Sequence, residues 1–254
     1  MISRMTYMEL RDFFKEHPRA AIAFSGGVDS TYLLAEALRL GADVKPYCAV
    51  TAFQPAFEQR EAAEFCTLLG AELTTLELDI LAETVVAANP PDRCYYCKTA
   101  IFTALKERAA ADGYELILDG TNASDDASDR PGMRALRELG VLSPLRICGL
   151  TKAEIRRRSR ELKLPTWNKP AYACLATRVY AGETITAEKL LRVEEAETAL
   201  REMGYSDLRV RLWHDAARLQ LPGDQLERAA AERKAILEAL KPWFGLVLLD
   251  LEER

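Results

Sequence analysis

The first 150 residues alternate short apolar runs with longer stretches in which apolar positions recur at helical spacing. An apolar run of about four to eight residues between turn residues is typical of a buried strand, whereas a period near 3.6 is typical of a helix that packs one face on a core. The runs predict strands at 20–24, 44–50, 73–78, 115–119 and 141–145. The helical stretches lie near 6–15, 30–40, 55–69 and 98–111.

Strands that alternate with helices favour a parallel sheet, because each connection between parallel strands needs a crossover segment. We therefore predict an α/β fold for this part of the chain, with a doubly wound parallel sheet and helices on both of its faces. Thr151 and Glu154 form a capping box, which predicts a further helix that runs to about Lys163.

The remainder of the chain follows a different order. The pattern predicts a helix at 187–203, strands at 207–213 and 217–222, a helix at 224–240 and a last strand at 244–250. This order is typical of a smaller α+β domain with an antiparallel hairpin. The segment 165–186 contains Pro165 and Pro170 and separates the two patterns, so we divide the chain into domains at 1–170 and 171–254.

The 254 residues are 49% hydrophobic and 29% charged, a composition typical of a globular protein. No stretch stays apolar for about 18 residues, and the N-terminus lacks the apolar core of a signal peptide. We therefore expect a cytoplasmic protein without a membrane partner. The net charge of −5 counts against a broad nucleic-acid surface. Six cysteines in such a chain are expected as thiols, ligands or catalysts rather than disulfides.

Residues 24–30 read Phe-Ser-Gly-Gly-Val-Asp-Ser, between a predicted strand and a predicted helix. Glycines let backbone N–H groups approach a phosphate closely, and the helix N-terminus favours negative charge. Asp29 and Ser30 are candidates to hold a magnesium ion and phosphate oxygens. The loop lacks the lysine of a Walker A motif. An ordinary Gly-Gly turn is the alternative, but the carboxyl end of a parallel strand is where open α/β sheets bind ligands.

A second polar loop, Asp119-Gly-Thr-Asn122, follows the predicted strand 115–119 and precedes further acidic residues at Asp125, Asp126 and Asp129. A loop at this end of the sheet can reach the same nucleotide as residues 24–30. A solvated acidic loop with Asp and Asn in turns explains the pattern equally well. Two guanidinium groups that could meet a phosphate follow at Arg130 and Arg134.

The cysteines divide into two kinds. Three have apolar neighbours and are predicted to be core thiols, namely Cys48, Cys66 and Cys148. Cys94 and Cys97 form a C-x-x-C motif that we expect in a loop after Pro90 and Pro91, and Cys174 lies in a separate segment. The C-x-x-C pair is compatible with a redox dithiol, with zinc or with an iron–sulfur cluster.

Zinc usually needs a fourth ligand, and neither His17 nor His214 is next to a cysteine. Three thiolates suit a [4Fe-4S] cluster in which one iron stays open. Such an open iron can hold the free sulfide that a sulfur donor needs. The predicted ligands of this cluster are Cys94, Cys97 and Cys174.

Period-two alternation in the predicted hairpin places Arg209 and Arg211 on the face opposite the apolar residues of the strand. Arg218 can join them across the turn. Three arginines on one sheet face can bind a phosphate monoester. A solvent-facing charged sheet remains the alternative at this point.

The order of motifs along the chain is Phe24-Ser-Gly-Gly-Val-Asp-Ser30, Arg93-Cys-Tyr-Tyr-Cys-Lys98, Asp119-Gly-Thr-Asn-Ala-Ser-Asp125, Asp129-Arg-Pro-Gly132, Ser143-Pro-Leu145, Thr151-Lys-Ala-Glu-Ile-Arg156, Lys169-Pro-Ala-Tyr-Ala-Cys-Leu-Ala-Thr-Arg178 and Arg209-Val-Arg211 with Ala217-Arg218. This order resembles that of the LarE family, ATP-dependent sulfur transferases that build the nickel-pincer nucleotide cofactor. The resemblance covers nearly the whole chain. It implies an N-type ATP pyrophosphatase (PP-loop) fold for 1–170 and a substrate-binding or oligomerisation domain at 171–254.

The resemblance also implies the reaction. ATP adenylates a carboxylate of pyridinium-3,5-biscarboxylic acid mononucleotide, pyrophosphate leaves, and sulfur then displaces AMP to form a thiocarboxylate. The pyrophosphate end of ATP would be bound by Ser25, Gly26, Gly27, Asp29 and Ser30. The residues expected near the nucleotide are Gly120, Thr121 and Asn122. Cys174 matches the sulfur-bearing cysteine, and Arg178 would act beside it in catalysis. The substrate phosphate would be bound by Arg209, Arg211 and Arg218.

Two forms of the family differ in their source of sulfur. One form sacrifices a single cysteine, here Cys174, which becomes dehydroalanine. The other form uses three cysteines, which match Cys94, Cys97 and Cys174, to hold a [4Fe-4S] cluster that passes on an extra sulfide from an unidentified source. Because all three cysteines are present, we expect the cluster form, with ATP and Mg²⁺ as the other cofactors and a homo-oligomer as the assembly.

This chain departs from the family pattern at Thr177, where serine is frequent, and at Trp213-His214, where His-Gly is expected. Three alternatives remain open. A tRNA thiolase would need a basic RNA-binding surface. An amide-forming synthetase of the same fold would have no use for the three cysteines. A nucleotide-sensing protein would bind ATP without turnover.

Overall fold

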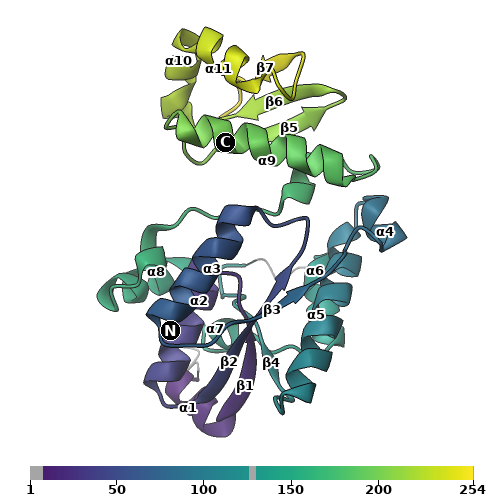
Figure 1. Cartoon of the computed structure of the whole chain (residues 1–254). Coiled ribbons are helices and arrows are strands. Elements are labelled where there is room, and N and C mark those ends of the chain that lie inside the picture. The colour runs from purple at the N-terminus through teal and green to yellow at the C-terminus, as the bar shows by residue number, and fades with distance from the viewer. Residues whose placement is uncertain (1–7, 126–129, 254) are drawn as a thin grey trace, which may run out of the picture. The chain divides into compact units, whose positions relative to one another are not determined.

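The structure is a computed structural model, and it describes residues 8–125 and 130–253. A parallel sheet of four strands forms the centre of the first part of the chain, in the order β3-β2-β1-β4 (Figure 1). Its strands are β1 (Arg19–Ala23), β2 (Asp43–Val50), β3 (Thr74–Glu77) and β4 (Ile117–Leu118). The predicted α/β class with a parallel sheet is confirmed.

The helices of this part lie on both faces of the sheet. They are α1 (Leu10–Glu16), α2 (Val28–Arg39), α3 (Ala56–Leu68), α5 (Arg93–Ala111), α6 (Pro131–Glu138), α7 (Pro144–Ile147) and α8 (Lys152–Glu161). Side chains alternate along β1, because successive residues of a strand point to opposite faces. Ile22 packs in a core with helices α1, α2, α3, α7 and α8, whereas Ala21 packs in a second core with α5 and α6.

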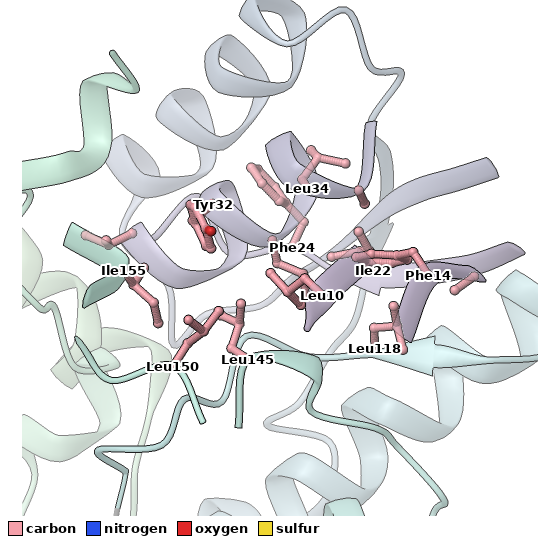
Figure 2. Packing of buried hydrophobic residues seen from close by; sticks show 14 of the residues in the cluster. Leu10, Phe14, Ile22, Phe24, Tyr32, Leu34, Leu118, Leu145, Leu150 and Ile155 are labelled. Atoms are coloured by element: carbon pink, nitrogen blue, oxygen red, sulfur yellow. The ribbon is translucent and has the colours of Figure 1, made fainter. Parts of the chain in front are cut away.

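Figure 2 shows the first of these cores from close by. Ile22 and Phe24 are two residues apart and point to the same side of the chain. They pack in one core with Tyr32 and Leu34 of α2 and with Leu118 of β4. All five side chains are buried. This packing holds the end of β1 and the beginning of α2 in fixed positions, and it is these ends that carry the predicted phosphate loop.

The structure corrects several predicted elements. The run 141–145 is not a strand, because Pro144 begins α7 and only a single bridge joins Leu142 to Leu118. Helix α5 begins at Arg93 rather than near 98, so that Cys94 and Cys97 lie on a helix and not in a loop. The helix α6 was not predicted, although Pro131 stands at its first position, where proline is favoured.

The chain divides into two compact units. The first contains residues 1–51, 56–80 and 92–171, and the second contains 52–55, 81–91 and 172–254. Within these ranges the chain passes from one unit to the other five times, after residues 51, 55, 80, 91 and 171. A domain boundary at residue 170, as predicted from the sequence, places both short insertions in the first domain. The assignment of the two units to ATP and to the substrate remains a prediction.

The first unit ends with a 3-10 turn, η1 (Pro165–Asn168). The second unit contains α4 (Thr84–Ala87), a 3-10 turn η2 (Leu175–Arg178), α9 (Ala187–Glu202), β5 (Arg209–Trp213), β6 (Ala216–Gln220), α10 (Gly223–Ala231), α11 (Arg233–Leu240) and β7 (Val247–Leu249). The predicted hairpin is present as β5 and β6, which are antiparallel. The predicted last helix is two helices that meet at Glu232, and β7 is parallel to β6.

None of the helices that the structure describes combines the length and the apolar character needed to cross a bilayer.

Candidate functional site

Two loops of the first unit lie at the point where the order of the sheet reverses. The chain runs from β1 outward to β2 and β3, and it then returns to place β4 on the other side of β1. Open α/β sheets bind ligands in the crevice beyond the carboxyl ends of such strands. The segment 25–30 follows β1 and the segment 119–125 follows β4, so both loops begin at this crevice.

The first loop requires its glycines. Gly26 has a φ of +68°, in the left-handed region, and a Cβ there would come within 3.0 Å of Ala62 on α3. Gly27 is the N-cap residue of α2, a helix of 12 residues. The first N–H groups of a helix have no partner within it and attract anions. The backbone of this loop is therefore suited to the phosphates of a nucleotide.

The two serines of the loop brace it internally. The hydroxyl groups of Ser25 and Ser30 share a hydrogen bond of 3.1 Å, and the backbone N–H of Ser25 donates to the Ser30 hydroxyl at 3.3 Å. Ser30 is buried and Ser25 is exposed. A hydroxyl on each side of the loop remains able to exchange these internal contacts for phosphate oxygens.

Asp29 stands in the first turn of α2 and pairs with Lys152 at the beginning of α8, at 2.6 Å. Burial raises the pKa of Asp29 above its ordinary value, and the hydrogen bond from Lys152 opposes this shift. The other carboxylate oxygen, Oδ1, is buried without a hydrogen-bond partner among the described residues. A buried carboxylate oxygen that lacks a donor is the kind of ligand that Mg²⁺ takes, so the residues present fit a magnesium ion.

The second loop approaches the first closely. A Cβ at Gly120 would lie 3.0 Å from the backbone nitrogen of Ser30, so only glycine fits without displacement. Asp119 accepts hydrogen bonds from the hydroxyl groups of Thr121 and Ser143, the latter at 2.6 Å. The acidic side chain at the head of this loop therefore shapes the loop instead of standing in solvent.

The remainder of the second loop is also held by its own polar groups. Asn122 is buried, receives a bond from the backbone of Ser124 at 2.8 Å, and donates its own N–H to Asp125 at 2.8 Å. The further acidic residues Asp126 and Asp129 lie outside the described residues.

Cys94 and Cys97 occupy the first two turns of α5 at a spacing that puts them on one face of the helix. The Cys94 thiol is exposed and the Cys97 thiol is half-buried. Arg134 of α6 lies over the ring of Tyr95, 4.2 Å from its centre, and pairs with Glu138 at 3.9 Å. The predicted phosphate contact of Arg134 stays a prediction.

The three predicted core thiols are buried. Burial raises the pKa of Cys48 to about 11 and that of Cys66 to about 12. Burial also raises the pKa of Cys148 to about 11. Thiols with such pKa values are not nucleophiles near neutral pH, so they are confirmed as structural.

Cys174 lies in the second unit, as the residue before η2, and it is half-buried. Its carbonyl accepts a hydrogen bond from Thr177 at 2.9 Å. Arg178 donates to the carbonyl of Ala173 at 2.8 Å and to the hydroxyl of Thr177 at 3.0 Å. The Thr177 hydroxyl, which a serine at this position would also supply, therefore helps to shape the Cys174 loop.

Arg178 is buried and is the partner of an equally buried carboxylate, Glu197 of α9, at 2.8 Å. Glu197 also accepts a bond from the backbone N–H of Val210 at 3.0 Å and pairs with Arg201 at 3.1 Å. Its remaining contact is the hydroxyl of Tyr172. The predicted catalytic role of Arg178 stays a prediction. Its contacts are those of a residue that positions the backbone around Cys174.

The hairpin brings the three predicted arginines together. Arg211 and Arg218 are directly opposite each other on β5 and β6, and Arg209 lies two residues away on the same face as Arg211. All three are half-buried. Arg211 donates to the carbonyl of Thr177 at 2.6 Å, and Arg218 pairs with Asp250 at 3.3 Å. The Arg209 side chain makes no hydrogen bond or ion pair with the described residues.

The arginine cluster carries more positive charge than Asp250, which pairs with Arg218, can neutralise. Burial, together with the neighbouring Arg178, lowers the pKa of Arg209. Burial and then Arg209 lower the pKa of Arg211. Like charges on a partly buried face are costly unless an anion binds between them, so this face is suited to a phosphate. The turn beside it places His214 at a φ of +53°, a conformation that glycine adopts at lower cost.

Within the described ranges, no group of three or more His, Cys, Asp or Glu side chains is arranged to hold a metal ion. Cys94 and Cys97 belong to the first unit, and Cys174 belongs to the second. None of the three forms a disulfide, and each has some exposure to solvent. Thiolate sulfur is the donor that iron–sulfur clusters take, so the chemistry of these three side chains fits such a cluster.

Sequence reasoning missed three side chains of this site. Lys152 and Lys169 both reach the phosphate loop, and Glu197 joins the hairpin to the Cys174 loop. Both lysines stand in motifs that carry the family resemblance, which was the available signal. Glu197 belongs to an acidic run that resembles a solvated helix face.

Comparison with known proteins gives the following similarities. No protein-family profile matches the chain. It is 40% identical over 223 residues to an uncharacterized protein of Synechocystis sp., which covers 86% of this chain and 82% of that protein. It is 36% identical over 212 residues to the pyridinium-3,5-bisthiocarboxylic acid mononucleotide synthase of Lactiplantibacillus plantarum, which covers 82% of this chain and 76% of the relative. The tRNA-specific 2-thiouridylase MnmA of Frankia alni is 27% identical over 60% of this chain.

The parallel sheet, the glycine loop at its switch point and the similarity to a thiouridylase define an α/β protein of the PP-loop class. The similarity to the mononucleotide synthase is closer and extends over more than two thirds of both chains. The chain belongs to the LarE family, that of the pyridinium-3,5-bisthiocarboxylic acid mononucleotide synthases.

Proposed function

We propose that the protein is an ATP-dependent sulfur transferase that converts carboxylates of pyridinium-3,5-biscarboxylic acid mononucleotide into thiocarboxylates. One observation within the second unit carries the proposal. Arg211 donates to the carbonyl of Thr177, three residues after Cys174, so an anion site adjoins the loop of a half-buried thiol. A substrate whose phosphate bound these arginines would present its ring near that thiol.

The phosphate loop of the first unit would bind ATP. Its backbone N–H groups and the Ser25 and Ser30 hydroxyls would take the pyrophosphate end, and Gly120, Thr121 and Asn122 would lie near the nucleotide. Asp29 would hold a Mg²⁺ ion, which when bound neutralises phosphate charge. A substrate carboxylate oxygen would then attack the α-phosphorus. The bond from that phosphorus to the bridging oxygen breaks, and pyrophosphate leaves with the electron pair.

The second half of the reaction replaces AMP by sulfur. A sulfide sulfur attacks the acyl carbon, the bond from that carbon to the AMP oxygen breaks, and AMP leaves with the electrons. Cys94, Cys97 and Cys174 would hold a [4Fe-4S] cluster, which when bound supplies a sulfur that can be replaced after each turnover. Arg178 and Glu197 would hold the Cys174 backbone still during this transfer.

The alternative within the family uses Cys174 itself as the sulfur donor. The Cys174 sulfur would attack the acyl-adenylate and release AMP. Loss of the Cα proton would then break the Cβ–S bond, and the thiocarboxylate would leave a dehydroalanine in the chain. Each protein molecule can donate its Cys174 sulfur only once by this route, whereas the cluster route can repeat.

The experiment that tests the proposal uses whole protein purified without oxygen. Iron and acid-labile sulfide are measured first, and the mononucleotide is then supplied with ATP, Mg²⁺ and sulfide. We expect substrate-dependent pyrophosphate release and a thiocarboxylate product detected by mass. Pyrophosphate release without a thiocarboxylate, or thiolation of added tRNA in its place, would reject the assignment.

The cysteine variants separate the two sulfur routes. Cys94→Ala should abolish bound iron and repeated turnover while it spares adenylation, and the buried Cys48→Ala serves as the control that retains both. If Cys94→Ala turns over as the unchanged protein does, and Cys174 loses the mass of one H₂S, the sacrificial route is correct.

A further inference from the structure

Lys169 is a charged side chain with an unusual position, five residues before Cys174 in the sequence. Its ammonium group donates to the carbonyl oxygen of Gly26 at 3.1 Å. It also pairs with Glu61 at 2.7 Å and lies 3.8 Å from Glu58. The side chain is only 14% exposed. Lysine is rarely buried to this extent unless it has partners. The three oxygen partners therefore fix the position of the Lys169 ammonium group.

The partner carbonyl belongs to the phosphate loop. The C=O of Gly26 and the N–H of Gly27 form one peptide unit, which is planar and trans, so the two groups point in opposite directions. A donor that fixes the carbonyl therefore also fixes the direction of the Gly27 N–H. That N–H now has only a long contact of 3.4 Å to the Ser25 hydroxyl. It is the first amide that an anion at the beginning of α2 would meet.

The helix α3 completes the arrangement. It carries both Glu58 and Glu61, and it also carries Ala62, against which Gly26 packs. The two carboxylates hold the Lys169 ammonium in position beside the loop. Lys169 thus joins the phosphate loop, α3 and its own segment through a single charged group.

A second connection links the same segment to the same loop. Arg156 of α8 donates to the carbonyls of Trp167 and Lys169 at 2.9 and 2.8 Å. One turn earlier on α8, Lys152 holds Asp29. The segment that leads to Cys174 is therefore joined to the loop at two points, directly through Lys169 and indirectly through α8.

We propose that Lys169 is a positioning residue that orients the Gly27 amide toward the nucleotide. Through the same side chain, the segment that precedes Cys174 becomes more tightly held when the phosphate loop binds a nucleotide. The inference rests on the proposed function. An anion on the Gly27 N–H polarises the peptide and makes its carbonyl a better acceptor for the Lys169 ammonium. A nucleotide in the loop therefore tightens the segment that precedes Cys174.

The test uses the whole protein and two measurements that do not depend on turnover. The first is the affinity for α,β-methylene ATP with Mg²⁺, measured by titration calorimetry. The second is the rate at which iodoacetamide alkylates Cys174 in iron-free protein, where this thiol is not a cluster ligand, followed by mass spectrometry with and without saturating analogue. We expect the analogue to slow alkylation of Cys174 about fivefold in the unchanged protein, which is at the low end for coupled sites.

Lys169→Met should weaken analogue binding about tenfold, as expected for the loss of one charged hydrogen bond. It should also abolish the effect of saturating analogue on Cys174. Lys169→Arg keeps a cationic donor and should therefore restore part of the analogue affinity and part of the effect on Cys174 alkylation. The exposed Lys163→Met is the matched control and should match the unchanged protein. Should Lys169→Met fail to fold, Glu61→Gln weakens the same contact without removing the lysine.

The outcomes are distinct. If the analogue still slows alkylation in Lys169→Met, the nucleotide shields Cys174 by another path and the inference is wrong. The same holds if the analogue has no effect on Cys174 in the unchanged protein. If the unchanged protein binds no analogue at all, it is the proposed function that fails.

Discussion

At the scale of single residues, Glu197 is a fully buried charge with several partners. Its side chain has no exposure to solvent, yet it faces Arg178, Arg201, the Tyr172 hydroxyl and the Val210 N–H. A buried ion pair of this kind adds little net stability, but removal of one partner leaves the other charge uncompensated. Glu197 therefore joins the helix α9, the hairpin and the Cys174 loop into one rigid group.

We predict that Glu197→Gln destabilises the protein by about 3–5 kcal/mol, because the Arg178 guanidinium loses its counter-charge in the interior. The free energy of unfolding in urea measures this effect. Glu195→Gln, on the exposed side of the same helix, is the control and should change stability little. Equal stability of the two variants would show that solvent or another acid compensates Arg178.

Sequence patterns predicted the residues whose role is local and missed those whose partners are distant. The glycine turn at Gly26 and the place of Asp29 in the first turn of a helix could be predicted because strand, turn and helix follow one another within a few positions. Their roles toward ATP stay predictions. Lys152 and Lys169 could not, because their partners Asp29 and Gly26 lie 123 and 143 residues away in the sequence. The family motifs that contain these lysines mark them as candidates, but spacing and periodicity around them do not indicate which residues they contact.

At the scale of elements, the helix α5 shows both the strength and the weakness of patterns. Its apolar face against the sheet was predicted, but its first turn was not, because residues 93–97 carry polar and aromatic side chains without a clear period. The C-terminal end of the same helix is tied to the sheet. Asp112, which follows it, pairs with Lys45 and accepts a bond from Tyr47, both on β2.

A pH dependence follows from this tie. The hydrogen bond from Lys45, followed by that from Tyr47, lowers the pKa of Asp112 from 3.8 to about 2. A carboxylate whose pKa is lower in the folded state stabilises the fold above its unfolded pKa and loses that contribution as pH falls toward the folded value. We predict that Asp112→Asn lowers Tm by a few degrees at pH 7 and by much less near pH 2. An equal difference at both pH values would contradict this.

The apolar run at 141–145 failed as a strand for a related reason. Periodicity cannot distinguish a short apolar run in a strand from one in a short helix. Pro144 settles the matter in the structure, since it lacks an N–H to donate and suits the first turn of α7. The capping box at Thr151 and Glu154, in contrast, is specific, and the predicted hydrogen bond is present at 3.3 Å.

At the scale of the whole molecule, the second unit depends on residues that come early in the chain. Asn89 is buried with a φ of +55°, and its amide donates to the carbonyls of Val179 and Tyr180 at 3.4 and 2.7 Å. Its own carbonyl accepts a bond from Gly182 at 2.7 Å. A residue that a division at 170 would assign to the first domain thus anchors the beginning of the second unit.

We predict that Asn89→Ala destabilises the second unit by about 1–3 kcal/mol, because the buried carbonyl of Val179 and the partly buried carbonyl of Tyr180 lose their donor. Hydrogen–deuterium exchange should speed up at residues 175–185 while strands β1 and β2 keep their protection. The exposed Asn168→Ala is the control. Uniform exchange in Asn89→Ala and the control would indicate that these carbonyls find other donors.

The repeated passage of the chain between the two units has a consequence for how such a protein can change over generations. Recombination moves one uninterrupted stretch of a gene at a time. A stretch that encodes residues 172–254 would arrive without residues 52–55 and 81–91, which belong to the same unit, and an exchanged N-terminal half would bring inserts that match a different C-terminal part. The two units of this protein are therefore expected to be inherited together and to change by point substitution rather than by the exchange of a whole module.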